Sequence, residues 1–236
     1  MSMLKRMPEL SLRLKVISGL IKTGGSVCDV GTDHGYLPAF LYLSGNFTSV
    51  TATDLREKPL LNAKKNLKEL NAEGVRLVLC DGLSKVERKE ADNVVIAGMG
   101  GEIISDIISK TDFLKDETVN LVLQPTTSAK DLREFLGSDG FEVLKEMAVS
   151  ENGKLYSVMQ VGYSGVKRKL SDYELYIGKL DLSDETAKKY ALKQLKILKK
   201  LVLDTEGIRE CEGKHLKAKK IINEIENAIG EENHGS

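Results

Sequence analysis

The sequence predicts an α/β fold: a doubly wound, mostly parallel sheet followed by a helical hairpin. Apolar runs alternate with helix-like segments through the first two-thirds of the chain, polar or glycine-rich residues follow several of these runs, and no β-rich run occurs after residue 164. The 236 residues suffice for one α/β domain with an appendage of about 60 to 70 residues. We therefore expect a first domain at residues 1–163 and a second at residues 164–236.

Five short runs are predicted strands because they are rich in β-branched and aliphatic residues. They are SVCDVG (26–31), SVTATDL (49–55), VRLVLCDG (75–82), NVVIAGMGG (93–101) and VNLVLQP (119–125). The last three are almost continuously apolar, which is typical of parallel strands buried on both faces. Helix-like segments are expected at residues 36–44, 58–70, 102–110 and 128–137.

Residues 141–163 predict two further strands joined at Asn152-Gly153, the dipeptide most typical of a tight hairpin. They would add an antiparallel edge to the sheet. Beyond them, Ser171 and Glu174 have the spacing of a capping box at a helix start. Apolar residues then recur in steps of four, three and four along two segments joined around residues 205–207: Ala191, Leu195, Leu198 and Val202, and Ala218, Ile222, Ile225 and Ile229. We expect these segments to form an antiparallel helical hairpin, packed on each other and on the preceding helix, although a partner-binding stripe has the same spacing.

Charge and cysteine usage limit the possible classes. The chain has 35 Lys and Arg against 35 Asp and Glu, so any nucleic-acid contact depends on local clusters such as residues 167–169 and 217–220. From residue 165 onward there are 15 Lys and Arg against 13 Asp and Glu, so the C-terminal segment is only slightly basic. The three cysteines lie far apart, and Cys28 and Cys80 fall in predicted buried strands, which indicates a reducing cytoplasm. No apolar run is long enough to span a membrane, the N-terminus lacks the pattern of a signal peptide, and no metal-ligand spacing occurs.

The loop after the first predicted strand carries most of the chemical information. Asp29 and Asp33 flank Gly31, and Asp33 stands where a dinucleotide-binding fingerprint has its middle glycine. Carboxylates repel a pyrophosphate but attract a sulfonium and an α-ammonium group, so the loop favours S-adenosylmethionine over NAD. A glycine-rich turn with no ligand is the alternative. His34, in the same loop, is either a partner for a phosphate or base or a structural residue.

The other strand ends support an adenosine ligand. Asp54 ends the second run, where a carboxylate binds ribose hydroxyls in both cofactor classes, or else caps the following helix. Asp81, followed by Gly82, either receives the adenine amino group or forms a turn. Residues 98–101, Gly-Met-Gly-Gly, leave room for a planar base; an anion site at the helix start is the other interpretation.

Four stretches together resemble the bacterial tRNA (adenine-22-N1)-methyltransferase family over about residues 10–163. They are D-V-G-T-D-H-G-Y-L-P, V-V-I-A-G-M-G-G-E-I-I, L-V-L-Q-P followed by Leu132-Arg133, and G-K-L-Y-S-V. The resemblance implies a Rossmann-like class I methyltransferase that uses S-adenosylmethionine to methylate N1 of an adenine in tRNA. By the same resemblance the cofactor would be bound by Asp29, Gly31, Asp33, His34, Asp54, Leu55, Asp81, Gly82, Ala97 and Gly98, and the target base by Met99, Gly100, Gln124, Pro125 and Arg133.

Two residues depart from the family pattern, which has Ala where Gly35 stands and Asn where Thr126 stands. Because Thr126 replaces this Asn, the resemblance gives little support for an Asn that holds the substrate base here. The chain also lacks the N/D-P-P-Y stretch of many amino-methylating relatives, which agrees with a ring-nitrogen target.

Methylation at N1 depends on alignment, since the neutral ring nitrogen already has a lone pair. Asp29 or Asp33 is the candidate to stabilise the positive charge that develops. A tRNA requires a second surface, for which the candidates are the helical hairpin and basic N-terminal residues: Lys5, Arg6, Arg13, Lys15 and Lys22. We expect a monomer or weak dimer. The competing classes are a methyltransferase for another RNA, a protein or a small molecule, an NAD oxidoreductase and a non-catalytic nucleotide-binding module.

Overall fold

The computed structural model describes residues 7–231 and contains a seven-stranded sheet in the order β3-β2-β1-β4-β5-β7-β6. Strands β1 to β5 pair in parallel, and β7 and β6 pair antiparallel at one side. The strands are β1 Ser26–Val30, β2 Ser49–Asp54, β3 Arg76–Leu79, β4 Asn93–Gly100, β5 Asn120–Thr127, β6 Phe141–Glu151 and β7 Lys154–Tyr163. The predicted doubly wound sheet with an antiparallel edge is therefore confirmed.

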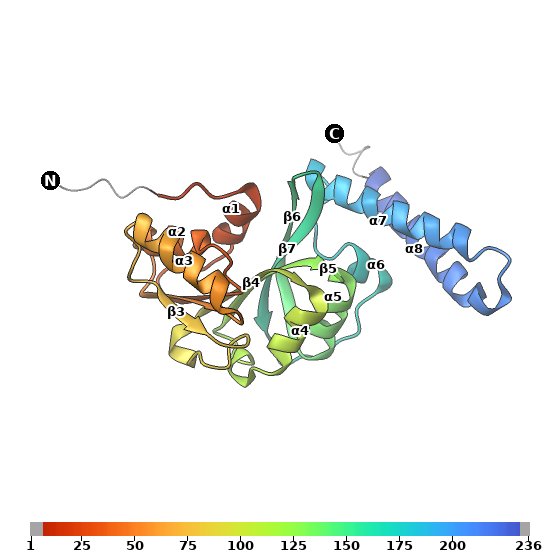
Figure 1. Cartoon of the computed structure of the whole chain (residues 1–236). Coiled ribbons are helices and arrows are strands. Elements are labelled where there is room, and N and C mark those ends of the chain that lie inside the picture. Colours follow the sequence, from red (N-terminus) through yellow and green to blue (C-terminus); the bar gives the residue numbers. More distant parts are fainter. Residues whose placement is uncertain (1–6, 232–236) are drawn as a thin grey trace.

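Helices cover both faces of the sheet (Figure 1). The α-helices are α1 Leu12–Gly19, α2 Tyr36–Ser44, α3 Glu57–Glu69, α4 Gly101–Ser109, α5 Ala129–Ser138, α6 Asp172–Tyr176, α7 Glu185–Asp204 and α8 Glu212–Glu231. Three short 3-10 helices are η1 Arg88–Glu90, η2 Asp112–Leu114 and η3 Arg209–Cys211. Alternate residues of β4 divide between two cores, since Val94 and Ile96 pack with α4 and α5 whereas Val95 packs with α1, α2 and α3.

Strand β3 corrects one expectation. Its apolar sequence predicted burial on both faces, but β3 lies at the open edge of the sheet, with Arg76 and Leu79 exposed. Only Val78 is buried within the strand. An edge strand has a neighbour on one side only, so its outer side chains stay accessible even where the sequence is apolar.

The β6–β7 hairpin forms as predicted. Asn152 and Gly153 join the strands with φ values of 50° and 72°, the left-handed backbone at both turn positions that a type I′ turn requires. The returning strand β7 inserts between β5 and β6, and β5 Val122 lies opposite Gln160.

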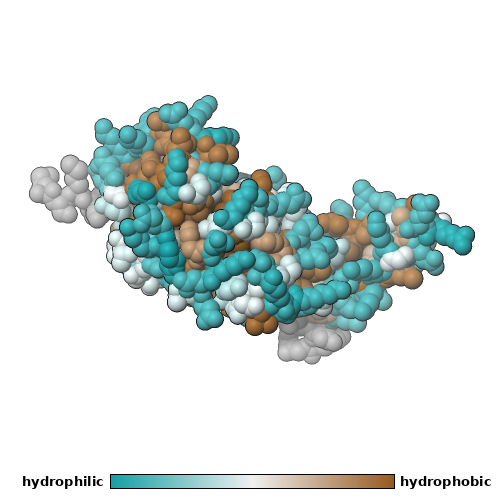
Figure 2. Space-filling model, turned by 90° about the horizontal axis from the view of Figure 1, so that it is seen from below, coloured by the Kyte–Doolittle hydropathy of each residue, from teal (hydrophilic) through white to brown (hydrophobic). Residues whose placement is uncertain are grey.

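The regular elements of the C-terminal segment, over its described residues, are all helices. The predicted capping box is present: the Ser171 hydroxyl accepts from the Glu174 amide at 3.2 Å, and the Glu174 carboxylate accepts from the Ser171 amide at 2.8 Å. Helices α7 and α8 then form an antiparallel pair that projects from the sheet (Figure 1). All eight residues of the two stepped sets lie in its shared core, so packing explains the spacing. Apolar side chains still reach the surface of the pair, among hydrophilic ones, toward the right of Figure 2.

Candidate cofactor and substrate site

Two adjoining cavities open at the carboxyl ends of β1, β2, β3 and β4. The first, of about 310 Å³, lies under the loop after β1, and the second, of about 430 Å³, extends along the ends of β2 and β3. Both are lined by Gly31, Asp33, Ala97 and Gly98. The sheet order reverses between β1 and β4, and ligands in open α/β sheets bind at this switch point. Each of the ten predicted cofactor residues lines at least one of the two cavities.

Asp29, in β1, is a buried carboxylate without a cationic partner among the described residues. Its residue exposure is 8%, and the Thr32 side chain hydrogen-bonds to it. Burial raises the pKa of Asp29 to about 6; the bond from Thr32 opposes this shift, and the nearby carboxylate of Asp54 adds to it. The carboxylate therefore favours a positively charged ligand in the first cavity.

Gly31 turns the chain away from β1 with φ +79°. Its amide and that of Thr32 donate to the Thr53 carbonyl at 2.8 Å and 3.0 Å, which joins the loop to β2. A side chain on Gly31 would place its Cβ 2.1 Å from the Met99 Cε. The absence of a side chain thus keeps the loop close to the end of β4, where the two cavities meet.

Asp33 and His34 lie at the rim. The His34 Nε2 is 3.2 Å from the Asp33 Oδ2, and more than half of each side chain is exposed. The His34 ring also lies 5.9 Å from the Tyr36 ring, measured between centroids. Both residues are accessible to a ligand, and their assigned roles stay predictions.

Asp54, at the end of β2, is 7% exposed and its Oδ1 accepts from the Arg56 amide at 2.8 Å. Helix α3 has Arg56 at its N-cap position and no side-chain cap, so the interpretation of Asp54 as a helix cap is wrong. Leu55 is exposed beside it. At the end of β3, Asp81 is exposed and Gly82 has φ +53°. These two residues do form a turn, and they line the second cavity as well.

The predicted substrate residue Gln124 is buried at the end of β5. Its Oε1 accepts from the Gly98 amide at 3.2 Å and from Arg13 at 2.6 Å, while its Nε2 donates to the Pro125 carbonyl at 2.9 Å. The same strands bring Met99 opposite Pro125 and Gly100 opposite Thr127. The structure thus brings together four of the five predicted substrate residues.

Arg13 is the site residue that sequence reasoning placed elsewhere. It was expected on a basic surface with Lys15 and Lys22, but it lines the first cavity and its Nε pairs with Glu151 at 3.1 Å. The contact with Gln124 joins residues 111 positions apart, and no local pattern reports such a contact. Lys5 and Arg6, from the same predicted surface, lie outside the described residues.

Arg133, the fifth predicted substrate residue, does not line either of the two cavities. It is buried in α5, where its guanidinium donates to Glu146 at 2.6 Å and to the Leu175 carbonyl at 2.8 Å and also bonds Tyr190. Burial acts to lower the pKa of Arg133, but Glu146 and Tyr190 hold it above its ordinary value. The guanidinium therefore joins α5, β6, α6 and α7, and its predicted contact with substrate gains no support from this geometry.

Two features are absent from the described part of the chain. Among its helices, none combines the length and apolar character needed to cross a membrane. Over the same residues, no group of three or more His, Cys, Asp or Glu side chains is placed to hold a metal ion.

The fold and the cavities at its switch point define a class I methyltransferase architecture. A family model described as a methyltransferase domain matches residues 10–159. The chain belongs to this family, and the predicted class is thereby confirmed.

Individual relatives are consistent with this assignment. The tRNA (adenine(22)-N(1))-methyltransferase of Bacillus subtilis is 32% identical over 153 residues, which are 64% of each protein, so the match spans just under two thirds of that relative. A crystal structure of the B. subtilis m1A22 tRNA methyltransferase TrmK superposes with a TM-score of 0.79 at 25% identity, covering 94% of this chain and 99% of the other. The crystal structure of a Streptococcus pneumoniae protein in complex with S-adenosyl-L-methionine superposes with a TM-score of 0.78 at 29% identity. The match covers 94% of this chain and 100% of the other.

Proposed function

We propose that this protein is an S-adenosylmethionine-dependent tRNA (adenine-22-N1)-methyltransferase, with a catalytic domain at residues 1–163 and a helical domain at residues 164–236. The observation that carries the proposal is the pair of joined cavities, in which Asp29 is buried without a cationic partner. The relatives' activity and the cofactor found with the S. pneumoniae protein support the same conclusion. We propose tRNA as the partner, a cytoplasmic location and a monomer or weak dimer.

The residues that line the cavities suit the charges and polar groups of this cofactor. Asp29 and Asp33 would attract its ammonium and sulfonium groups, and Arg13 is the cation beside them for its carboxylate. In the second cavity, Asp54 faces the place of the ribose hydroxyls and Asp81 that of the adenine amino group, between apolar walls that include Ile103 and Ile107. When bound, the cofactor supplies an electrophilic methyl group.

The protein's own residues position the target base and stabilise the charge that develops on it. Met99, Gly100, Gln124 and Pro125 border the place of the target base, and the Gln124 carboxamide is held by Arg13 and the Gly98 amide. This arrangement would orient adenine N1 toward the methyl group and exclude water. Because N1 lies on the Watson–Crick edge, the base must be unpaired or turned out of its stack, which costs a few kcal/mol. The Asp29 carboxylate would stabilise the positive charge that forms on the ring.

The test is transfer of labelled methyl groups to an unmodified tRNA transcript, followed by mapping of the modified nucleotide. We expect 1-methyladenine at nucleotide 22 and no transfer to a transcript with guanine there. Methylation at another nucleotide would overturn the position, and transfer only to small molecules or proteins would overturn the substrate class. Gln124→Ala should lose most of the turnover and weaken cofactor binding to a smaller extent, because its side chain borders the place of the target base and also holds Arg13 and the Gly98 amide.

A further inference from the structure

We propose that a cleft between the catalytic domain and α7 binds one nucleotide next to the methylated adenine. This inference rests on the proposed function, since it assumes an RNA substrate. The cleft has a volume of about 250 Å³ and is lined by Pro125, which lines neither cofactor cavity. It admits one base, with the sugar and phosphate at its mouth.

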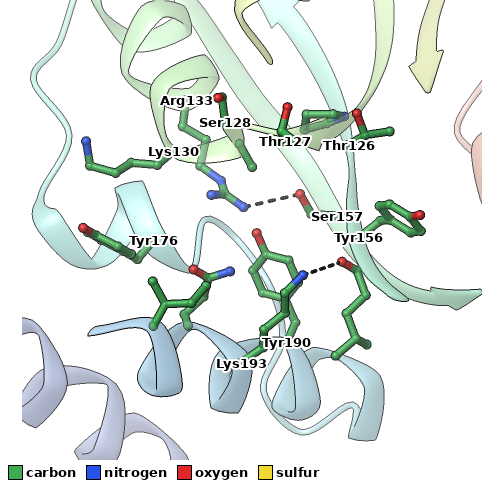
Figure 3. Close-up of a pocket in the computed structure, with 15 residues that line it drawn as sticks. Thr126, Thr127, Ser128, Lys130, Arg133, Tyr156, Ser157, Tyr176, Tyr190 and Lys193 are labelled. Carbon is green, nitrogen blue, oxygen red and sulfur yellow. Dashed lines mark hydrogen bonds between the residues drawn. The ribbon is translucent and has the colours of Figure 1, made fainter. Parts of the chain in front are cut away.

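The cleft is formed by residues of β5, α5, β7, α6 and α7 (Figure 3). The end of β5 and the start of α5 contribute residues 125–130, β7 contributes residues 155–157 and α6 contributes Tyr176. Helix α7 contributes Tyr190, Lys193, Gln194 and Ile197. The buried Arg133 in α5 bonds Glu146 in β6 and Tyr190 in α7, and these bonds fix the spacing between α5 and α7. The walls of the cleft are therefore held in place by the protein itself. Figure 3 shows Lys193 reaching across from α7 toward β7, where it donates to the Leu155 carbonyl at 3.3 Å.

Two of the residues that line the cleft, Pro125 and Tyr156, are next to the residues that border the place of the target base. Pro125 follows the buried Gln124, and the Tyr156 ring lies 5.8 Å from the Arg13 guanidinium carbon. Arg13 in turn holds Gln124. A base between Gln124 and the cofactor would therefore have its neighbouring nucleotide at Pro125 and Tyr156, inside the cleft.

The side chains suit a nucleotide. Lys193 is exposed, and its ammonium forms no ion pair with a described residue, which leaves its charge for a phosphate. Lys130 also lines the cleft, although its ammonium lies 3.5 Å from Asp131 and 3.8 Å from Glu134. Half-buried Tyr156 and Tyr176 present aromatic rings for stacking.

The polar groups of the loop add hydrogen-bonding capacity. Thr126 and Thr127 are exposed, and Ser128 stands before α5 with φ +52° and no cap bond from its side chain. None of the 15 residues that line the cleft is acidic. Two accessible lysines, aromatic rings and free hydroxyls, with no carboxylate in the lining, favour an anionic ligand with a planar ring, which the RNA substrate supplies. The third cation of the lining, Arg133, is already paired with Glu146.

The test compares steady-state kinetics of the full chain with an unmodified tRNA transcript. We expect Lys193→Gln to raise KM for tRNA about threefold or more and to reduce the salt dependence of binding by about one phosphate contact. Tyr156→Leu should raise KM about fivefold or more, while Tyr156→Phe stays close to the wild type because the ring remains. Cofactor affinity should be unchanged in Lys193→Gln.

The matched control is Lys199→Gln, which removes an exposed lysine of the same helix that does not line the cleft. The cleft is not a nucleotide site if the Lys193 and Lys199 variants change KM for tRNA equally, or if neither Lys193→Gln nor Tyr156→Leu changes it. In both cases the proposed function stands as long as the wild type methylates tRNA. A wild type that methylates no tRNA contradicts the function itself. A photoreactive residue at Ile197 supplies a second readout, expected to crosslink a nucleotide adjacent to the methylated adenine; a crosslink elsewhere would contradict the proposal.

Discussion

Two buried carboxylates, Asp29 and Glu146, lie in opposite electrostatic environments. Glu146, at the joint between the sheet and the C-terminal helices, is bonded to Arg133 and to the Lys179 amide. Asp29, at the cofactor site, is bonded to the hydroxyl-bearing side chain of Thr32 and has a second carboxylate nearby. The protein neutralises the charge where its own parts must stay together, and leaves it open where a cationic ligand is expected.

Each region also holds a glycine that approaches a neighbour closely. A Cβ on Gly178 would lie 1.9 Å from the Glu146 Oε2 and 2.7 Å from the Arg133 Nε. A Cβ on Gly31 would meet only the end of the Met99 side chain. The joint is thus closed by a buried ion pair that cannot move aside, whereas the site is bordered by a side chain that can rotate.

The largest expected effect is at the joint. Arg133→Met leaves Glu146 buried and unpaired, which should lower the free energy of unfolding by about 3–5 kcal/mol, measured in urea. The double variant Arg133→Met/Glu146→Leu should recover most of the loss, because it removes both charges. If Arg133→Met is as stable as the wild type but has a raised KM for tRNA, Arg133 contacts the substrate as the sequence predicted.

The second prediction compares the two glycines. Gly178→Ala should lower the free energy of unfolding by about 3 kcal/mol, since it adds backbone strain and displaces a buried charge. Gly31→Ala should cost about 1–2 kcal/mol because Met99 can turn away. Gly45→Ala, at φ +71° with nothing within 4 Å of the added Cβ, measures the strain alone. Equal losses at Gly178 and Gly45 would show that the ion pair tolerates the added methyl group.

The third prediction separates stability from binding at Asp29. Asp29→Asn should raise the free energy of unfolding of the cofactor-free protein by about 1–3 kcal/mol near pH 8, because the buried charge is removed. The same change should weaken cofactor binding about tenfold or more, measured by calorimetry. Asp33→Asn, at the exposed rim, is the control and should leave stability unchanged. Normal cofactor affinity with full turnover in Asp29→Asn would refute the role of this carboxylate.

The smallest effect is a dependence on pH. With a pKa of about 6 in the folded protein, Asp29 takes up a proton below that pH, and a cationic cofactor must displace it. Affinity should therefore fall by up to about tenfold per pH unit below about pH 6. The contribution of Asp29 to stability has the opposite sign: the folded state binds the proton more tightly than the unfolded chain, so this contribution is largest in acid and is lost as the pH rises through about 6. Asp29→Asn should abolish both dependences.

Most of the fold followed from local patterns. Strand runs, the Asn152-Gly153 turn and the capping box at Ser171 depend on residues close in sequence, and each is present. The edge position of β3 was missed because exposure depends on which strand lies beside it, and Arg76–Leu79 has a neighbour on one side only.

The same distinction between local patterns and tertiary contacts applies to the candidate site. The strand-end residues from Asp29 to Gly98 line the same two cavities because parallel strands carry their carboxyl ends to one edge, and Gln124 bonds the Gly98 amide beside them. Arg13 reaches Gln124 through the packing of α1 against the sheet, and Arg133 turns inward to Glu146 because α6 and α7 cover it. Tertiary contacts of this kind leave no periodic pattern in the sequence.

The insertion of β7 between β5 and β6 affects how the chain assembles during synthesis. Strand β5 has no partner on its outer side until Lys154–Tyr163 has left the ribosome, although β1 to β5 are complete by Thr127. Over that interval the nascent chain exposes a buried apolar strand edge that can pair with other chains. The tight Asn152-Gly153 turn shortens the exposure, because it brings β6 and β7 together locally before the pair docks on β5.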